Sequence, residues 1–347
     1  MRYLVTGAGG AIGGHVVKRL LADGHMVRAV DIKPFDEWWQ RHPDAQEWEG
    51  DLREDIEARM AVTHRPIGGP QTHHGLPPSP PIDRVIHLAC DMGGVEWLEA
   101  NRAAAIMSVQ ISTAMLPAAS DAGVDRYFNA SSACAYPINI QDRPDIQALR
   151  ESDAYPAMPE PGYGEHKLYE EQMCRYFRED YGLETRVARF HNVFGTHGSW
   201  TGGREKAPAA ICRKVAEAVI DGTGSIEIFG DGEQTRSYLA VEECVEGILR
   251  ITESDYTEPL NLGSAEMVTV NQLVDLVETI AGLEVGELDR IYRLEAPQGV
   301  RGRSSDNTLI AEVLGWQPSA PLVTGMIELY EWVFDQVKAV RDRDSDA

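Results

Sequence analysis

A glycine-rich turn near the N-terminus constrains the fold of this chain more than any other feature. The glycines follow the spacing GxxGxxG, with Gly7, Gly10 and Gly13 in register. An apolar strand pattern at residues 3–6 precedes the turn, and a helical pattern at residues 11–22 follows it. Glycine lets the backbone approach a ligand closely, and the N-terminus of a helix favours an anion. The turn therefore predicts a parallel α/β sheet whose first strand ends at the pyrophosphate of a dinucleotide.

An acidic residue, Asp31, follows the second apolar strand pattern at residues 26–30. A carboxylate at this position accepts hydrogen bonds from the ribose of adenosine and repels a 2′-phosphate, which favours NAD over NADP. Arg28 and Lys33 lie close to it in the sequence and weaken that preference. The residues that we expect to contact NAD are Gly7, Gly10, Ala11, Ile12, Gly13, Asp31, Asp51, Leu52, Leu88, Tyr163 and Lys167.

Tyr163 and Lys167 form a Tyr-x-x-x-Lys pair within a helical pattern at residues 162–181, so their side chains share one face. A free phenol has a pKa of about 10 and is a poor base, but an ammonium group one turn away favours the phenolate. The hydroxyl of Ser132 can share the moving proton. These groups are typical of an enzyme that takes a proton from an alcohol while a hydride leaves its carbon. Cys134, two residues later, is a thiol that hydride transfer alone does not need.

Further apolar patterns extend the predicted sheet. Strand patterns occur at residues 84–88, 126–129 and 185–188, and one long helical pattern covers residues 96–122. This alternation predicts an α/β fold: a Rossmann-type doubly wound parallel sheet with a smaller C-terminal α/β lobe.

One stretch, at residues 64–81, is rich in proline, glycine and histidine and interrupts the alternation. We interpret it as an exposed insertion loop. A metal site of His64, His73 and His74 is the alternative, but no cysteine or carboxylate spacing supports a ligand set, so we expect no metal.

Composition restricts the partners. The formal net charge is −23, which disfavours nucleic acid and anionic membranes. Five cysteines without CxxC spacing indicate neither a disulfide framework nor a zinc site. The chain opens on its first strand pattern without a signal peptide, and its uninterrupted apolar runs stay short of about 18 residues. We therefore expect a cytosolic (cytoplasmic) protein.

Longer motifs carry a resemblance to a known family. They are DMGG at residues 91–94, SSACAYP at 131–137, GGREKAPAA at 202–210, GDGEQTR at 230–236 and GVRGRSSDN at 299–307. Together with GxxGxxG, Ser132, Tyr163 and Lys167, they make the chain similar to the extended short-chain dehydrogenase/reductases. Within that group it resembles the GDP-mannose 3,5-epimerase family, from residue 2 to about residue 335.

The resemblance implies a role for each matching residue. Cys134 and Lys206 would be the acid/base pair that inverts sugar carbons, and Tyr163, Lys167 and Ser132 would run the redox step. Substrate would be bound by Met92, Gly93, Asn192, Lys206, Arg236, Arg301 and Arg303. The resemblance also implies NAD, a GDP-sugar substrate and a homodimer. Residues 1–188 with about 234–255 would form the NAD-binding domain, and about 189–233 with 256–337 the nucleotide-sugar lobe. Val95, Glu96 and Trp97 depart from the family pattern, which usually has a small residue and then Phe there.

These residue types suit an epimerase for a chemical reason. Oxidising the C4 hydroxyl of a sugar to a ketone makes the hydrogens at C3 and C5 removable, and each inversion then needs an acid and a base near the right pKa. A cysteine becomes a competent base beside a cation. In a chain this acidic, Arg236 and Arg303 in glycine-rich loops favour an anion clamp on a diphosphate.

Other interpretations stay open from the residues alone. Cys134 could be a small buried hydrophobe, Lys206 a solvated surface charge, and each arginine a salt-bridge partner. A nucleotide-sugar 4-epimerase shares the fold and needs neither the thiol nor a second lysine. A 4,6-dehydratase needs carboxylates where Ala133 and Cys134 stand. A catalytically silent NAD-binding regulator could dispense with Tyr163 and Lys167.

Overall fold

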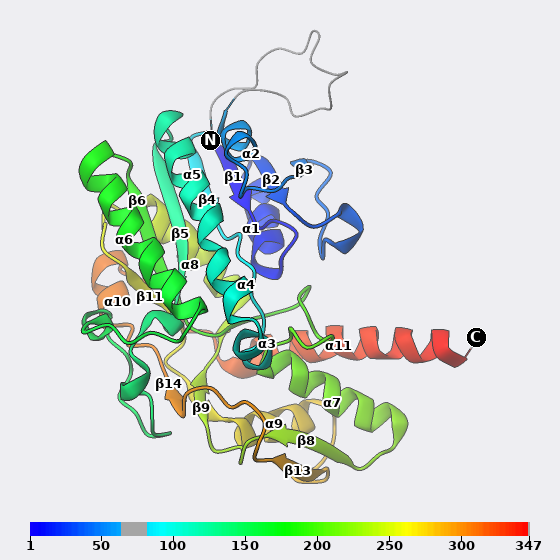
Figure 1. Cartoon of the computed structure of the whole chain (residues 1–347). Helices are drawn as coiled ribbons and strands as arrows, with labels where there is room; N and C mark the ends of the chain where they lie inside the picture. The colour runs from blue at the N-terminus through cyan, green and yellow to red at the C-terminus, as the bar shows by residue number, and fades with distance from the viewer. Residues whose placement is uncertain (64–81, 346–347) are drawn as a thin grey trace.

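A seven-stranded parallel sheet forms the centre of the computed structural model, which describes residues 1–63 and 82–345 (Figure 1). The strand order is β11-β6-β5-β4-β1-β2-β3. The strands are β1 (Arg2–Thr6), β2 (Met26–Asp31), β3 (Gln46–Glu49), β4 (Arg84–His87), β5 (Arg126–Ser132), β6 (Thr185–Phe190) and β11 (Leu260–Leu262). Every neighbouring pair runs parallel. This confirms the predicted doubly wound α/β fold.

Helices cover both faces of the sheet (Figure 1). On one face, Tyr3 and Val5 of β1 share a core with α1 (Ala11–Ala22) and α8 (Val241–Glu253). On the other face, Leu4 shares a core with α2 (Asp55–Val62), α5 (Val109–Asp121) and α6 (Tyr163–Tyr181). Successive strand residues point to opposite faces, so both sets of side chains are buried. This is why the strands read as continuous apolar runs in the sequence.

The order of the strands reverses between β1 and β4, which are hydrogen-bonded neighbours in the sheet. The glycine turn follows β1, and the segment at residues 91–94 follows β4. In open α/β sheets, ligands bind outside the carboxyl ends of the strands at such a reversal. The fold therefore brings the predicted cofactor turn and the predicted sugar loop to one edge.

A second lobe lies beyond that edge of the sheet (Figure 1). Its core is formed by α7 (Ala207–Asp221), α9 (Val270–Ile280), α11 (Leu322–Ser345) and the parallel pair β8 (Ser225–Phe229) and β13 (Asp289–Arg293). Two small sheets connect the lobes: β12 (Met267–Thr269), β9 (Thr235–Ser237) and β14 (Gly302–Arg303) in one, and β7 (Val193–Phe194) and β10 (Leu239–Ala240) in the other. Other elements are α3 (Val95–Ala100), α4 (Arg102–Met107), α10 (Thr308–Leu314) and the 3-10 turns η1 (Phe35–Glu37), η2 (Ala133–Ala135), η3 (Ile138–Ile140) and η4 (Glu151–Ala154).

The predicted lobe boundary needs one correction. Strand β11 lies in the range that we assigned to the second lobe, yet Leu260 and Leu262 pair with β6 at the edge of the main sheet. Their side chains are fully buried in the same core as α8. The chain therefore returns to the main sheet after α8, a long-range pairing that no local pattern reveals.

The prediction of one continuous helix at residues 96–122 is also wrong. The segment is divided into α3 (Val95–Ala100), α4 (Arg102–Met107) and α5. Asn101 has φ −126° and ψ 38°, and its side-chain Nδ2 donates to the Trp97 carbonyl at 2.9 Å. A short polar side chain that bonds the local backbone competes with the helix in this way. The break lets α3 turn over the edge of the sheet.

One described stretch, Arg102–Asp121, is long and apolar enough to cross a membrane by length and composition alone. It spans the junction of α4 and α5. Helix α5 packs against α2 and α6, and its Met115 and Leu116 are fully buried. The α5 part of the stretch is therefore a core helix of the sheet. Both interpretations of residues 64–81, the loop and the histidine site, lie outside the described residues.

Candidate active site

The glycine turn has a backbone geometry that only glycine fits. Gly7 has φ +72°, and a Cβ there would lie 2.9 Å from the amide nitrogen of Ala89. A Cβ on Gly13 would lie 2.1 Å from the carbonyl oxygen of Gly7. Gly10 caps α1 and donates its N–H to the Gly7 carbonyl at 3.1 Å. The first N–H groups of α1, at Ala11 and its neighbours, lack helical partners and point out at the edge of the sheet, which suits a pyrophosphate.

Asp31 lies beside this turn. Its Oδ2 accepts the N–H of Gly9 at 2.9 Å, and its Oδ1 accepts the N–H of Lys33 at 3.1 Å. Arg28 is buried and donates to the carbonyls that end α2, with Ala61 O at 2.6 Å. Arg28 is therefore occupied as a helix cap and is not available to a 2′-phosphate. The residues present fit NAD.

Changing Asp31 is expected to weaken NAD and relax the selectivity against NADP. In Asp31→Ala the ribose of NAD loses its predicted carboxylate acceptor, and a hydrogen bond to a charged group contributes about 1.5–3 kcal/mol, or roughly a 10- to 150-fold change in affinity. Asp31→Asn keeps an oxygen for Gly9 but removes the charge, so NADP should gain affinity relative to NAD. Calorimetric titration with both dinucleotides measures the ratio. An unchanged ratio in both variants would show that Asp31 does not face the ribose.

The other predicted cofactor contacts lie at the ends of β3 and β4. Leu88 donates its N–H to the Thr6 carbonyl at 3.3 Å, which fixes the backbone there. Leu52 is buried in the core. The side chain of Asp51 is ion-paired with Arg53 at 2.6 Å, and hydrogen bonds from Arg53 lower the pKa of the carboxyl. Contacts of these residues with NAD stay a prediction.

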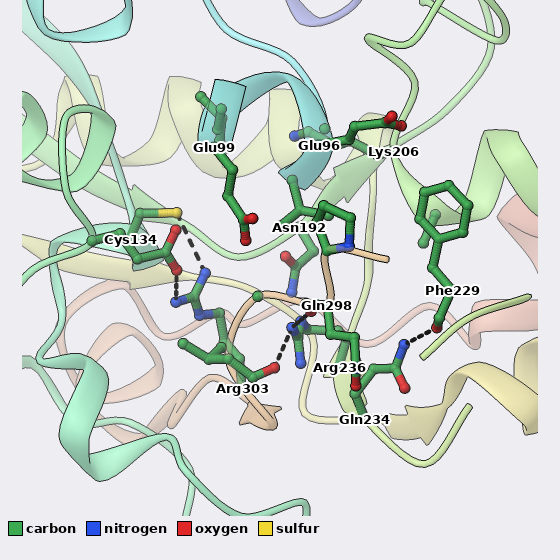
Figure 2. Close-up of a pocket in the computed structure, with 18 of the residues that line it drawn as sticks. Glu96, Glu99, Cys134, Asn192, Lys206, Phe229, Gln234, Arg236, Gln298 and Arg303 are labelled. Atoms are coloured by element: carbon green, nitrogen blue, oxygen red, sulfur yellow. Dashed lines mark hydrogen bonds and ion pairs between the residues drawn. The ribbon is translucent and has the colours of Figure 1, made fainter. Parts of the chain in front are cut away.

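A cavity of about 810 Å³ lies between the edge of the sheet and the second lobe (Figure 2). Ile12 of the cofactor turn lines it, as do Ser132, Cys134 and Tyr163. All the predicted substrate-binding residues line it too: Met92, Gly93, Asn192, Lys206, Arg236, Arg301 and Arg303. The fold therefore gathers the predicted redox, acid/base and substrate residues around one space.

Ser132 and Tyr163 form the sheet side of the cavity. Ser132 ends β5, and its Oγ accepts the N–H of Cys134 at 3.2 Å, which caps the turn η2. Tyr163 begins α6 and is largely buried. Burial raises the pKa of its phenol, while the charge of Lys167 and a hydrogen bond from Ser132 lower it. Tyr163 is thus protonated in the resting protein and depends on its neighbours to lose the proton.

Lys167 lies behind Tyr163, with its Nζ 5.8 Å from the centre of the phenol ring. Its Nζ is 2.9 Å from Oε2 of Glu170, one turn further along the same face. Burial opposes the charge of Lys167, but Cys90, Glu170 and Tyr163 outweigh burial and raise its pKa overall. Lys167 is therefore held as a cation beside the phenol.

A buried polar chain extends from Glu170 to the glycine turn. Ser112 donates to Oε1 of Glu170, and Ser112 Oγ is 3.1 Å from Nε2 of His87. Nδ1 of His87 is 2.8 Å from the hydroxyl of Thr6, its partner across β1 and β4. These buried polar contacts were not predicted from the sequence. The available signals were a polar residue at the end of each strand and a carboxylate three residues after Lys167.

Removing the Glu170 carboxylate is expected to destabilise the fold. Glu170→Ala leaves Lys167 buried without its partner, and breaking a buried ion pair costs about 3–5 kcal/mol. Burial raises the pKa of Glu170, but Lys167, His166 and His87 together outweigh burial and hold that pKa below the ordinary value. The contribution is therefore complete above the unfolded pKa of about 4.3 and declines as the pH falls below it.

Urea unfolding at neutral pH measures this loss. Glu179→Ala is the matched control, because Glu179 lies on the same helix in an exposed pair with Arg175 at 3.8 Å. Such surface pairs contribute at most about 1 kcal/mol. Equal losses in the two variants would contradict a structural role for the Glu170 pair.

Cys134 lies in the turn η2, just beyond Ser132 and the end of β5. Of its surface, 9% is exposed. Arg303 Nη1 is 3.4 Å from its sulfur. The same guanidinium donates through Nη2 to Oε1 of Glu160 at 2.5 Å and through Nε to Oε1 of Gln141 at 2.7 Å. Burial and the charge of Glu160 raise the pKa of the Cys134 thiol, and Arg303 opposes them. Neither Glu160 nor Gln141 was predicted from the sequence.

Lys206 and Asn192 come from the second lobe. In Figure 2, Lys206 lies across the cavity from Cys134, and Asn192 lies between them. Lys206 caps the N-terminus of α7, and burial lowers the pKa of its amine. Asn192 has φ +46° and donates to the carbonyl of Ser237 at 2.8 Å. An amine with a lowered pKa opposite a thiol provides two proton-transfer groups on different sides of a bound ligand.

The three arginines predicted to bind the substrate differ in how their charge is balanced, and two of them, Arg236 and Arg303, were predicted to clamp a diphosphate. Arg301 is paired with Asp231 at 3.0 Å, and Arg303 is paired with Glu160. Arg236 instead donates to backbone carbonyls, with the oxygen of Val300 at 2.6 Å. Burial and the charge of Arg303 lower the pKa of Arg236 to about 10, which still leaves it charged at neutral pH. Of the three, Arg236 has the charge most available to a phosphate.

Comparison with known proteins places this site in a family. A profile of the NAD dependent epimerase/dehydratase family matches residues 3–263. The chain belongs to this family. Its cofactor is accordingly NAD, as the turn and Asp31 predict.

Relatives of known name are similar over nearly the whole chain. GDP-mannose 3,5-epimerase 1 of Oryza sativa subsp. indica is 41% identical over 339 residues, covering 97% of this chain and 83% of the relative. GDP-mannose 3,5-epimerase of Arabidopsis thaliana is 40% identical over 347 residues, covering 100% of this chain and 85% of the relative. Among solved structures, UDP-glucose 4-epimerase of Thermotoga maritima with UDP-glucose superposes with a TM-score of 0.81 at 26% identity, covering 97% and 100% of the two chains.

Proposed function

We propose that this member of the epimerase/dehydratase family is a GDP-mannose 3,5-epimerase, giving GDP-L-galactose, GDP-L-gulose or both. The observation that carries the proposal is the presence of Cys134 and Lys206 on opposite sides of the cavity that also holds Tyr163. The rice and Arabidopsis relatives of that name, similar over the whole chain, support it.

The first step takes place at C4 of the sugar. The glycine turn and Asp31 would hold NAD, which would supply the acceptor for the C4 hydride and its later return. Tyr163 removes the proton of the C4 hydroxyl, and Lys167 behind it stabilises the phenolate. Ser132, which lines the same side of the cavity, donates a hydrogen bond to the forming ketone oxygen. The arrangement of these three groups thus serves a reversible oxidation.

The second step inverts the neighbouring carbons. The C4 ketone makes the hydrogens at C3 and C5 acidic, so a base can remove each one as an enolate forms. Cys134 and Lys206 exchange protons with opposite faces of the ring, one removing and the other returning a proton. Arg236 holds the diphosphate, so the sugar extends toward Tyr163. Reduction of the ketone then completes the reaction without net redox change.

A nucleotide-sugar 4-epimerase is the alternative that these residues favour less. Such an enzyme lets the ketone present either face and needs no acid/base pair at C3 and C5. Nothing in that reaction uses a thiol at Cys134 or an amine with a lowered pKa at Lys206. A silent NAD-binding regulator would need none of the cluster around Tyr163.

One reaction tests the proposal. The protein is incubated with GDP-mannose in deuterated water, and the sugar is examined by NMR. Deuterium at C3 or C5, with L-galactose or L-gulose in the product, is the expected result. Inversion at C4 alone without solvent label would reject the 3,5-epimerase and leave the 4-epimerase.

A homodimer is the second part of the proposal. Ile106 and Met107 on α4 and Tyr169 and Tyr176 on α6 are exposed, and the two helices contact each other. Exposed apolar side chains gathered on neighbouring helices suit a two-fold interface. Cytosolic localisation stays a prediction.

Light scattering tests the dimer. The paired substitution of Met107→Glu and Tyr169→Glu is expected to halve the molar mass in solution, because two charges would be buried in the interface. Tyr292→Glu, at an exposed tyrosine of the second lobe, is the matched control and should leave the mass unchanged. A monomeric mass for the parent chain would refute the dimer.

A further inference from the structure

Glu160 lies at the sulfur side of the cavity and belongs to a compact cluster with Cys134 and Arg303. Its Oε1 is 2.5 Å from Arg303 Nη2, and Arg303 Nη1 is 3.4 Å from the Cys134 sulfur. Figure 2 shows both contacts of Arg303. The backbone N–H of Glu160 also donates to the Cys134 carbonyl at 3.0 Å. A carboxylate, a guanidinium and a thiol thus lie within contact distance of one another.

The cluster is fixed from several sides. Gln141 Oε1 accepts Arg303 Nε at 2.7 Å, and only 5% of Arg303 is exposed. A Cβ added to Gly164 would lie 2.1 Å from the Cys134 carbonyl and 3.2 Å from the Cβ of Glu160. The first turn of α6 therefore packs directly onto the turn that carries the thiol. In such a packed site, the carboxylate cannot move away without disturbing its neighbours.

The charges that face the sulfur oppose one another. The titratable groups that act on Cys134 or pack against it are Glu160, Arg303, Lys206, Arg236, Tyr163 and Cys90. The carboxylate of Glu99 also points into the cavity (Figure 2). Three of the titratable groups are cations, which favour a thiolate. A thiolate held by three cations would be a weak base, because a low pKa means low affinity for a proton. Glu160 is the carboxylate that contacts Arg303, and its charge works in the opposite direction to the cations.

We propose that Glu160 is a positioning residue for the acid/base thiol: it holds Arg303 against Cys134 and keeps a proton on the sulfur of the resting enzyme. The proposal rests on the proposed function only in taking Cys134 as the acid/base group. Glu160 lies in the loop before α6 and reaches the reaction through the sulfur and Arg303. It therefore sets how readily the thiol gives up and takes back a proton.

The experiment measures the protonation of Cys134 directly. The NAD-saturated full-length protein is treated with iodoacetamide at a series of pH values, and labelling of the Cys134 peptide is quantified by mass spectrometry. The pH at which the labelling rate is half-maximal reports the pKa of the Cys134 thiol. In Glu160→Gln the midpoint is expected to fall by about one unit or more, because removing a like charge within about 4–6 Å favours the thiolate. The thiolate fraction below both midpoints would then rise about tenfold.

Two further variants make the test specific. Glu96→Gln removes the same charge from an exposed glutamate that lines the same cavity, and its midpoint should equal that of the parent. Glu160→Asp keeps the charge but withdraws it by one methylene, so its midpoint should lie between those of the parent and Glu160→Gln. The pH dependence of solvent exchange into GDP-mannose should shift in Glu160→Gln by the same amount and in the same direction. Loss of packing alone does not produce such a shift.

An unchanged or higher midpoint in Glu160→Gln overturns the proposal. If Glu160→Gln loses NAD binding and its helical circular dichroism signal, the variant is misfolded, and Glu160→Asp serves as the test. A labelling midpoint in Glu160→Asp equal to that of the parent protein would then overturn the proposal. Labelling of Cys134 does not require the enzyme to turn over substrate, so the role of Glu160 and the proposed 3,5-epimerase function are tested independently. If the labelling midpoint falls in Glu160→Gln but the parent protein exchanges no solvent hydrogen into GDP-mannose, the proposed function is rejected and the role of Glu160 stands. If the parent protein exchanges but the midpoint does not change in Glu160→Gln, the proposed function stands and the role of Glu160 is rejected.

Discussion

Cys134→Ala is expected to abolish solvent exchange at C3 and C5 of GDP-mannose and to leave the affinity for NAD unchanged. A positioned acid/base group contributes about 10²- to 10⁴-fold to a rate, and here one of the two such groups is removed. Cys134 is not among the residues predicted to contact NAD, so binding should persist. Tyr163 also remains, so oxidation at C4 should continue and return GDP-mannose. NMR in deuterated water, with a parallel NAD titration, measures both quantities.

Cys134→Ser is the matched variant for that prediction. Serine keeps a small polar group beside Arg303, whose Nη1 lies 3.4 Å from the sulfur of the parent, so packing and charge change little. A serine hydroxyl gives up its proton far less readily than a thiol, so exchange should be lost here as well. If exchange persists in the alanine variant, the thiol has only a packing role, and the assignment of a 3,5-epimerase loses its main support.

The features predicted correctly from the sequence are those that neighbouring residues determine. Helix α1 begins and ends at the predicted residues, because the glycine turn fixes its start and its apolar residues repeat at the helical period. Tyr163 and Lys167 share a face of α6 because four residues make about one turn. The parallel sheet follows from the alternation of strands and helices, since a parallel strand needs a crossover.

The features that the sequence did not reveal depend on contacts between distant segments. Arg303 reaches Glu160 and Gln141, which lie far from it in the chain, and no periodic pattern connects them. From the sequence alone, a role for Arg303 in clamping the diphosphate could therefore not be distinguished from a place beside the Cys134 sulfur, where the structure shows it. Asn101 divides the predicted helix through a side-chain bond to the backbone, which a hydrophobic pattern does not register. Such contacts need the folded arrangement of all the elements.

Tyr163→Phe is expected to abolish both the chemistry at C4 and the exchange at C3 and C5. The enolates form only once C4 is a ketone, so a chain that cannot oxidise C4 has nothing for Cys134 and Lys206 to deprotonate. Phenylalanine fills the same space as Tyr163, of which 7% is exposed, so the fold should tolerate it. The loss should reach about 10²- to 10⁴-fold, as for removal of any positioned acid/base group.

The two variants separate the redox group from the acid/base pair. On mixing with GDP-mannose, the parent and Cys134→Ala should show a transient nicotinamide absorbance, whereas Tyr163→Phe should show none. Solvent exchange should occur in the parent alone. Exchange in Tyr163→Phe at the parental rate would mean that another group takes the C4 proton. Because Lys167 is paired with Glu170 at 2.9 Å and does not depend on the phenol for its position, its charge remains in the variant. The lost activity would then be assigned to the missing hydroxyl.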